Sequence, residues 1–151
     1  MKKRIIWLIV IIILIIAGII GYNQYTKSEQ KDAKSEQIRN EAISRTDFLI
    51  INNTNNKHTG PVYLFEEFTG TILNTAKYTK YHNIVVQISY YDKHKNFIAK
   101  EVVTLNQEIC PGKSDEYKII SKRKKIFKVS SFDIKIIDAN FTTLKGLNSC
   151  Y

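Results

Sequence analysis

The sequence predicts an antiparallel β-sandwich domain behind an N-terminal transmembrane helix and a polar linker. Three observations lead to this prediction. Residues 5–20 form an uninterrupted apolar run, residues 23–46 are almost entirely polar, and the chain beyond consists of short apolar stretches broken by turn residues. The expected domains are the basic tip and membrane segment at 1–22, the linker at 23–46 and the all-β domain at 47–151.

The N-terminal segment predicts an uncleaved single-pass membrane anchor. Residues 5–20 read IIWLIVIIILIIAGII and contain no charged side chain. Extended to Tyr22, the run forms a helix of about 27 Å, close to the roughly 30 Å of a hydrocarbon core. Trp7 and Tyr22 lie near its ends, as interfacial aromatic residues do. The basic residues at 2–4 favour a cytoplasmic N-terminus, so we expect bilayer contact through residues 5–22 and a C-terminal domain outside the cytoplasm.

A cleaved signal peptide is the main alternative, because signal peptides also combine basic residues with an apolar region. Their apolar region has about 7–15 residues, which is shorter than this run. Ile15/Ala17 and Ile19/Gly21 are the candidate cleavage pairs, and both match poorly. A lipid anchor is not expected, because no cysteine follows the run directly.

The linker at 23–46 predicts a polar helix or a flexible stalk that lifts the domain from the bilayer. KSEQ occurs at 27–30 and again at 34–37, a spacing of seven residues. A coiled coil, however, needs apolar residues at positions a and d over several heptads. The apolar candidates are only Ala33, Ile38, Ala42 and Ile43.

The remaining chain predicts six or seven short strands. In HNIVVQISYYD, residues 82–92, apolar or aromatic side chains occupy every second position from Ile84 to Tyr90, which is the period of a half-buried strand. Phe132, Ile134 and Ile136 alternate with charged residues in the same way. The other expected strands cover 47–52, 62–74, 97–105, 116–120 and 130–139, and NNTNNKHTGP at 52–61 has the composition of a loop. Short strands without an intervening helical period favour a two-sheet sandwich.

The stretch YYDKHKNFIAK, residues 90–100, contains several reactive side chains but predicts a hairpin turn. One strand ends at Tyr91 and the next begins at Phe97, which leaves residues 92–96 as the loop. Asp92 can accept local backbone hydrogen bonds, and asparagine tolerates positive φ. His94 has no cysteine, serine or second histidine nearby, so we expect no catalytic role for it.

Several of these residues resemble the FxLYD-type bacterial domains. The similar segments are Gly70-Thr71-Ile72-Leu73-Asn74, Val85 to Asp92 with its Tyr-Asp pair, Leu105, and Pro111-Gly112-Lys113-Ser114 followed by Tyr117. The resemblance covers about residues 62–138 and implies an Ig-like sandwich in a cell-envelope protein, often behind a membrane segment or lipid anchor. It implies no catalytic residue. The family usually has glycine in the turn after Asp92, where this chain has Lys95 and Asn96.

Other candidates for chemistry are isolated. Glu66 and Glu67 are adjacent, so on a strand they point to opposite faces and cannot act together. His58, His82 and His94 lie in separate segments without a second ligand at metal-binding spacing. The chain has no glycine-rich phosphate loop and no G-x-S-x-G motif. We therefore expect no catalytic residues, no metal and no cofactor.

Cys110 and Cys150 are the only cysteines, and both follow the expected anchor. An oxidising compartment permits a bridge between them, and we expect one; two free thiols are the alternative. The closed loop of about 40 residues would stabilise the fold by roughly 4 kcal/mol.

The net charge of +9 favours anionic partners. The most concentrated positive charge is a basic loop at 122–128, which contains Lys122, Arg123, Lys124, Lys125 and Lys128. Our first hypothesis is a non-catalytic interaction or structural module of the bacterial cell envelope, with an envelope protein or anionic polymer as partner. The alternative is a binding domain for lipid headgroups or wall polymer through this loop. A solvated loop is the simpler explanation for the charge, an enzyme is a third hypothesis, and nucleic acid is not expected as a partner outside the cytoplasm.

Overall fold

The computed structural model describes the backbone of residues 2–59, 65–121, 129–143 and 150, and their side chains except those of 2–11, 54–59 and 65. The chain divides into two compact units, Met1–Arg39 and Asn40–Tyr151. Helix α1 spans Lys2–Ile43, so its last turn belongs to the second unit. The linker, for which a helix and a flexible stalk were both open, is therefore helical as far as Ile43.

The transmembrane helix expected at the N-terminus is not confirmed. Over the part of α1 whose side chains the structure describes, residues 12–43, no stretch is long and apolar enough to cross a membrane. Residues 5–11, which begin the expected anchor, lie outside the described side chains. The anchor therefore stays a prediction from the sequence.

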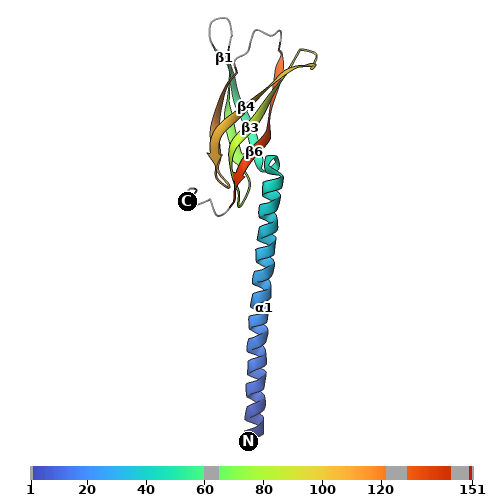
Figure 1. The fold of residues 1–151 in the computed structure, drawn as a ribbon, viewed down its shortest axis with the longest axis vertical. Coiled ribbons are helices and arrows are strands. Elements are labelled where there is room, and N and C mark those ends of the chain that lie inside the picture. The colour runs from blue at the N-terminus through green and yellow to red at the C-terminus, as the bar shows by residue number, and fades with distance from the viewer. Residues whose placement is uncertain (1, 60–64, 122–128, 144–149, 151) are drawn as a thin grey trace. The chain divides into compact units, whose positions relative to one another are not determined.

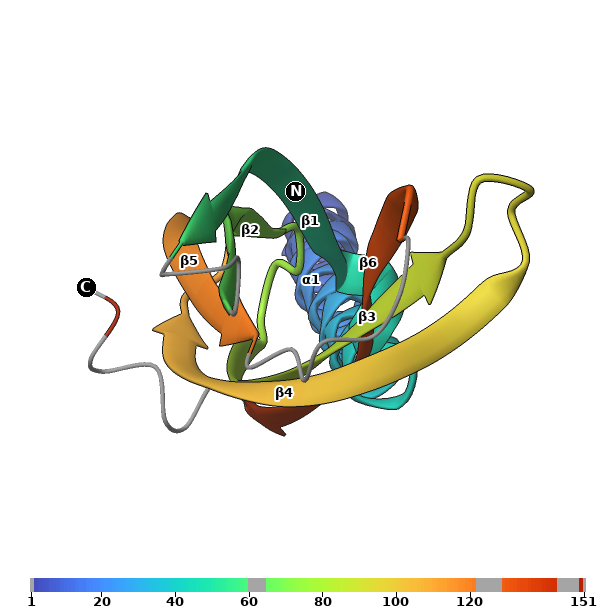
Figure 2. The same cartoon turned by 90° about the horizontal axis from the view of Figure 1, so that it is seen from above.

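The second unit contains two antiparallel three-stranded sheets, with strand order β1-β2-β5 in one and β4-β3-β6 in the other (Figures 1 and 2). A short 3-10 helix, η1 (Arg45–Phe48), leads into the first strand. The strands are β1 (Leu49–Thr59), β2 (Phe65–Asn74), β3 (Lys80–Tyr91), β4 (Phe97–Ile109), β5 (Ser114–Ser121) and β6 (Ser131–Thr142). The expected architecture of two antiparallel sheets is confirmed.

Strand β1 is longer than the sequence predicts. The prediction of a loop at 52–61 was wrong for residues 52–59, which continue β1 and pair with β2 as far as Thr59 opposite Phe65. Backbone groups make the ladder, so a polar edge strand can pair without apolar side chains. A register shift between Asn53 and Asn55 lies within the asparagine-rich stretch that favours a turn.

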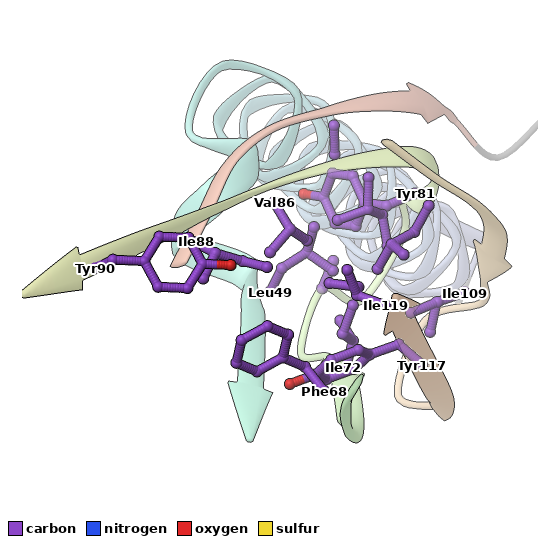
Figure 3. Packing of buried hydrophobic residues seen from close by; sticks show 14 residues of the cluster. Leu49, Phe68, Ile72, Tyr81, Val86, Ile88, Tyr90, Ile109, Tyr117 and Ile119 are labelled. Carbon is purple, nitrogen blue, oxygen red and sulfur yellow. The ribbon is translucent and has the colours of Figure 1, made fainter. Parts of the chain in front are cut away.

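The core lies between the two sheets (Figure 3). Ile84, Val86 and Ile88 are fully buried and Tyr90 nearly so, which confirms the predicted face of β3. Phe68 of the opposite sheet packs against Tyr90, with ring centroids 6.4 Å apart. Among the side chains that the structure describes, the remaining buried apolar residues are Leu49, Ile72, Ala76, Tyr81, Leu105, Ile109, Tyr117, Ile119 and Ala139.

Candidate functional site

Cys110 and Cys150 form a disulfide, with their Cα atoms 5.7 Å apart. Cys110 directly follows β4 and opens a tight turn in which the Lys113 N–H donates to the Cys110 carbonyl at 3.1 Å. Gly112 in this turn has φ +68°, a left-handed conformation that favours glycine. The bridge therefore fixes residue 150 to the turn between β4 and β5.

Asn74, at the end of β2, connects this turn to two other segments. Its side chain is fully buried. Nδ2 donates to the carbonyls of Thr79 and Ile109, both at 2.9 Å, and Oδ1 accepts from the Ala76 N–H at 2.9 Å. The Asn74 backbone N–H and carbonyl both bond to the turn at 111–113, each at 2.9 Å. One side chain thus joins the ends of β2 and β4 to the segment that leads into β3.

Gly70 allows close packing between strands, because its strand partner Tyr117 packs across it. A Cβ atom at Gly70 would lie 2.8 Å from Tyr117 Cε1 and closer still to the Asn52 carbonyl oxygen. The Tyr117 hydroxyl lies 3.3 Å from Asn53 Oδ1, and burial raises the pKa of Tyr117. Gly70, Asn74, the turn at 111–113 and Tyr117 belong to the segments that resemble FxLYD-type domains, and in this structure they act in packing and turn formation around β2.

The last turn of α1 supplies a buried carboxylate that the sequence did not reveal. Glu41 is fully buried. Its carboxylate accepts hydrogen bonds from the N–H groups of Lys77 at 2.9 Å and Tyr78 at 3.0 Å, and its backbone carbonyl accepts one from the Tyr81 hydroxyl at 2.7 Å. Burial, and next the Glu41 charge, raise the pKa of Tyr81 well above its ordinary value. Glu41 thereby fixes the segment before β3 to the end of the helix.

A third polar cluster joins the two sheets. The Tyr90 hydroxyl lies 3.1 Å from Ser121 Oγ and 3.4 Å from Glu101 Oε2, and Ser121 Oγ donates to the same carboxylate oxygen. A serine beside a carboxylate raises the question of a nucleophile. Ser121 is only 1% exposed, however, so a substrate could not reach it in this conformation. The cluster is suited to holding β3 and β4 against β5.

An open depression of about 510 Å³ lies over β2 and β5. It is lined by Thr69, Gly70, Thr71, Glu116, Tyr117 and Lys118. Beside it, Lys118 Nζ lies 2.9 Å from Glu67 Oε2. These hydroxyl and charged groups can form hydrogen bonds with a polar partner, but the depression is open, whereas small-molecule pockets are largely enclosed.

The hairpin between β3 and β4 is a turn, as predicted. Asp92 Oδ1 accepts from the N–H groups of His94 at 2.7 Å and Asn96 at 2.8 Å, and Oδ2 accepts from Asn96 Nδ2 at 3.0 Å. These bonds, chiefly those from Asn96, hold the pKa of Asp92 below its usual value. Lys95, rather than Asn96, adopts the positive φ, at +65°.

The other candidates do not come together. Glu66 is buried, whereas Glu67 pairs with Lys118, so the two carboxylates lie on opposite faces as expected. His58 and His82 lie on different sheets. Over the described residues, no three His, Cys, Asp or Glu side chains converge to hold a metal ion. The basic loop with Lys122, Arg123, Lys124, Lys125 and Lys128 lies outside the described residues.

The described residues form a β-sandwich with one disulfide, Cys110–Cys150. Its polar clusters connect neighbouring strands and the segments between them. The chain matches no protein-family model, and no curated protein is significantly similar to it in sequence. A structural match exists to a DUF1425 family member from Shewanella sp. pv-4, with a TM-score of 0.40, 11% identity, and coverage of 61% of this chain and 79% of that chain. The resemblance to FxLYD-type domains is not confirmed and stays a prediction.

Proposed function

We propose that this chain is a membrane-anchored, extracytoplasmic and non-catalytic module of the bacterial cell envelope, with an interaction or structural role. The Cys110–Cys150 disulfide carries the proposal, because disulfides persist in oxidising compartments and are rare in the cytosol. The apolar run at 5–20 behind the basic residues 2–4 supports the anchor and its orientation. An Ig-like sandwich of the FxLYD type is the fold we propose for the outer domain.

The polar clusters support a non-catalytic role. Asn74 and Glu41 are completely buried, and their side chains bond to backbone groups of neighbouring segments. Ser121 is buried between a tyrosine and a carboxylate of the opposite sheet. Each group is used to hold the sandwich together, whereas an active site needs functional groups that a substrate can reach.

Labelling of intact cells tests the proposed topology. We expect His94→Cys, in an exposed turn, to react with a membrane-impermeant maleimide in intact cells. Lys3→Cys is the matched control and should react only after permeabilisation. Mass spectrometry of the purified chain should find an N-terminus before residue 5. Labelling of position 3 in intact cells would contradict the orientation, and a chain that starts near Gly18 or Tyr22 would contradict the anchor.

The second candidate is binding of an anionic envelope component through the basic loop, favoured by five basic residues within positions 122–128. The test compares Lys122→Gln/Lys124→Gln/Lys125→Gln with a control in which Lys93, Lys95 and Lys100 are changed to glutamine. The three control lysines are exposed on or beside another hairpin. Only the loop variant should lose binding to phosphatidylglycerol vesicles. Equal loss in both variants would indicate a general charge effect and contradict a loop-specific site.

A further inference from the structure

Strand β6 lies at one edge of its sheet. β6 is the last strand of the sheet β4-β3-β6, and among the described residues no strand pairs with its other side. In an immunoglobulin-type sandwich, strand G lies beside the strand that corresponds to β6. Here the disulfide holds Cys150 at Cys110, in the turn between β4 and β5. An unpaired edge presents backbone N–H and carbonyl groups that can bind another strand.

The core is incompletely covered along this edge. Phe132, Ile134 and Ile136 of β6 pack against the core but are only partly buried. The corresponding side chains of the central strand β3, such as Ile88, are fully buried. The Phe132 ring packs edge-on against Phe68, with centroids 4.9 Å apart, so its inner side already belongs to the core. A strand added beside β6 would cover the part that remains exposed.

Other parts of the sandwich margin are bridged by side chains. At the far end of β6, Arg45 Nη1 donates to the Ala139 carbonyl at 2.7 Å and lies 3.1 Å from Asp138 Oδ1. At the opposite margin, Gln107 of β4 donates to the Asp115 carboxylate at 3.0 Å and to the Glu116 carbonyl on β5. Over the residues that the structure describes, the part of β6 without such a bridge or a strand beside it is Ser131–Ile137.

We propose that this segment pairs antiparallel with the same segment of a second copy of the chain, with Ile134 opposite Ile134 of the second copy. In this register Asp133 of each copy lies opposite Lys135 of the other, which gives two oppositely charged pairs on the outer face. Phe132 lies opposite Ile136 on the core face. Opposite charges placed directly across a strand pair stabilise it, and like charges destabilise it.

The charge pattern selects this register over its neighbour. If Lys135 instead lay opposite Lys135 of the second copy, two like charges would meet and Asp133 would face Ile137. Side chains alternate between the two faces of a strand. A register of the two β6 strands is therefore compatible with both cores only if the core-facing side chains of both copies lie on the same face of the joined sheet. The pairing would join two three-stranded sheets into one of six strands. The inference supplies a partner for the interaction module proposed above and in that respect rests on it.

Charge exchange tests the pairing in the full chain, solubilised in neutral detergent micelles. Sedimentation equilibrium should show a dimer for the wild type. Lys135→Asp and Asp133→Lys each convert two attractive pairs into two repulsive ones, so each should raise the dissociation constant by roughly tenfold or more. The double variant Asp133→Lys/Lys135→Asp should restore wild-type dimerisation. Lys100→Asp, the same charge change on the exposed face of β4, is the control and should have little effect.

A monomeric wild-type chain would overturn the proposal, as would a dimer that both single variants leave unchanged. The second result would assign dimerisation to another surface, such as α1. Failure of the double variant to recover, with its thermal unfolding unchanged, would refute the register. The maleimide topology test does not depend on dimerisation, so failure of this inference and failure of the proposed location can be distinguished.

Discussion

Replacement of Asn74 by alanine should strongly destabilise the sandwich. The side chain makes three hydrogen bonds of 2.9 Å and is fully buried, so Asn74→Ala leaves two carbonyl groups and one N–H without these partners. A buried polar group that loses its partner costs about 1–3 kcal/mol. Carbonyls can retain other bonds and water can enter part of the space, so we use the lower end of this range. The expected loss is about 3–4 kcal/mol in the free energy of unfolding.

Scanning calorimetry under non-reducing conditions is a suitable assay, because the only tryptophan, Trp7, lies outside the second unit. For a domain of this size, about 3–4 kcal/mol corresponds to a fall in Tm of roughly 10–15 °C. Asn106→Ala, at an exposed position of β4, is the matched control and should change stability by less than about 0.5 kcal/mol. If Asn74→Ala lowers stability no more than this control does, the assigned role of Asn74 is wrong.

Asn74→Asp separates hydrogen bonding from packing, because aspartate has nearly the same volume. An ionised carboxylate would face the carbonyl oxygens of Thr79 and Ile109 that now accept hydrogen bonds. This contact should raise the folded-state pKa of the new carboxyl above its unfolded value. The variant should therefore regain stability as the pH falls through that pKa, because the protonated carboxyl can donate to one carbonyl again. Stability of the variant that is independent of pH between about 4 and 7 would contradict this geometry.

Three further predictions concern the disulfide, the hairpin and the buried tyrosine. Cys110→Ser should lower the free energy of unfolding by roughly 2–4 kcal/mol, and non-reducing peptide mapping of the wild type should find Cys110 linked to Cys150; two free thiols would contradict the bridge. His94→Ala should leave stability within about 0.5 kcal/mol, because the His94 side chain is exposed; a change of about 2 kcal/mol in thermal unfolding would show a structural role. Because burial raises the folded-state pKa of Tyr81, stability should be fully present below the ordinary value of 10.0 and fall as the pH rises above it. Urea titrations at pH about 9–11 should show this fall reduced in Tyr81→Phe, and an unchanged slope would contradict the assignment.

The strand pattern could be predicted where burial alternates along one strand. Ile84, Val86, Ile88 and Tyr90 repeat every two residues because one face of β3 meets the core, and this period is visible in the sequence. The hairpin after β3 was equally accessible, because Asp92 bonds to groups within four residues of itself. Both features depend on neighbours close in the chain or on a regular repeat.

Strand β1 could not be delimited in the same way. Its second half, residues 52–59, is rich in asparagine and has no apolar repeat, yet it pairs with β2 through backbone groups. The side-chain pattern carries little information about such pairing, because every residue except proline offers the same N–H and carbonyl. The decisive factor is the partner strand β2, which begins at Phe65 and is not encoded in the segment itself.

Glu41 shows the same limit for a site residue. In sequence it resembles Glu29 and Glu36, which belong to the same polar stretch and are exposed on α1. Glu41 differs because it lies in the last helical turn, within the second unit, where the N–H groups of Lys77 and Tyr78 reach its carboxylate. These donors lie 36 and 37 residues away, so no local motif could indicate the pairing. The Glu41 carboxylate is buried and accepts hydrogen bonds from two backbone N–H groups, so Glu41 is part of the sandwich unit and not of an exposed linker. The boundary of the sandwich unit therefore lies inside α1 rather than after its end.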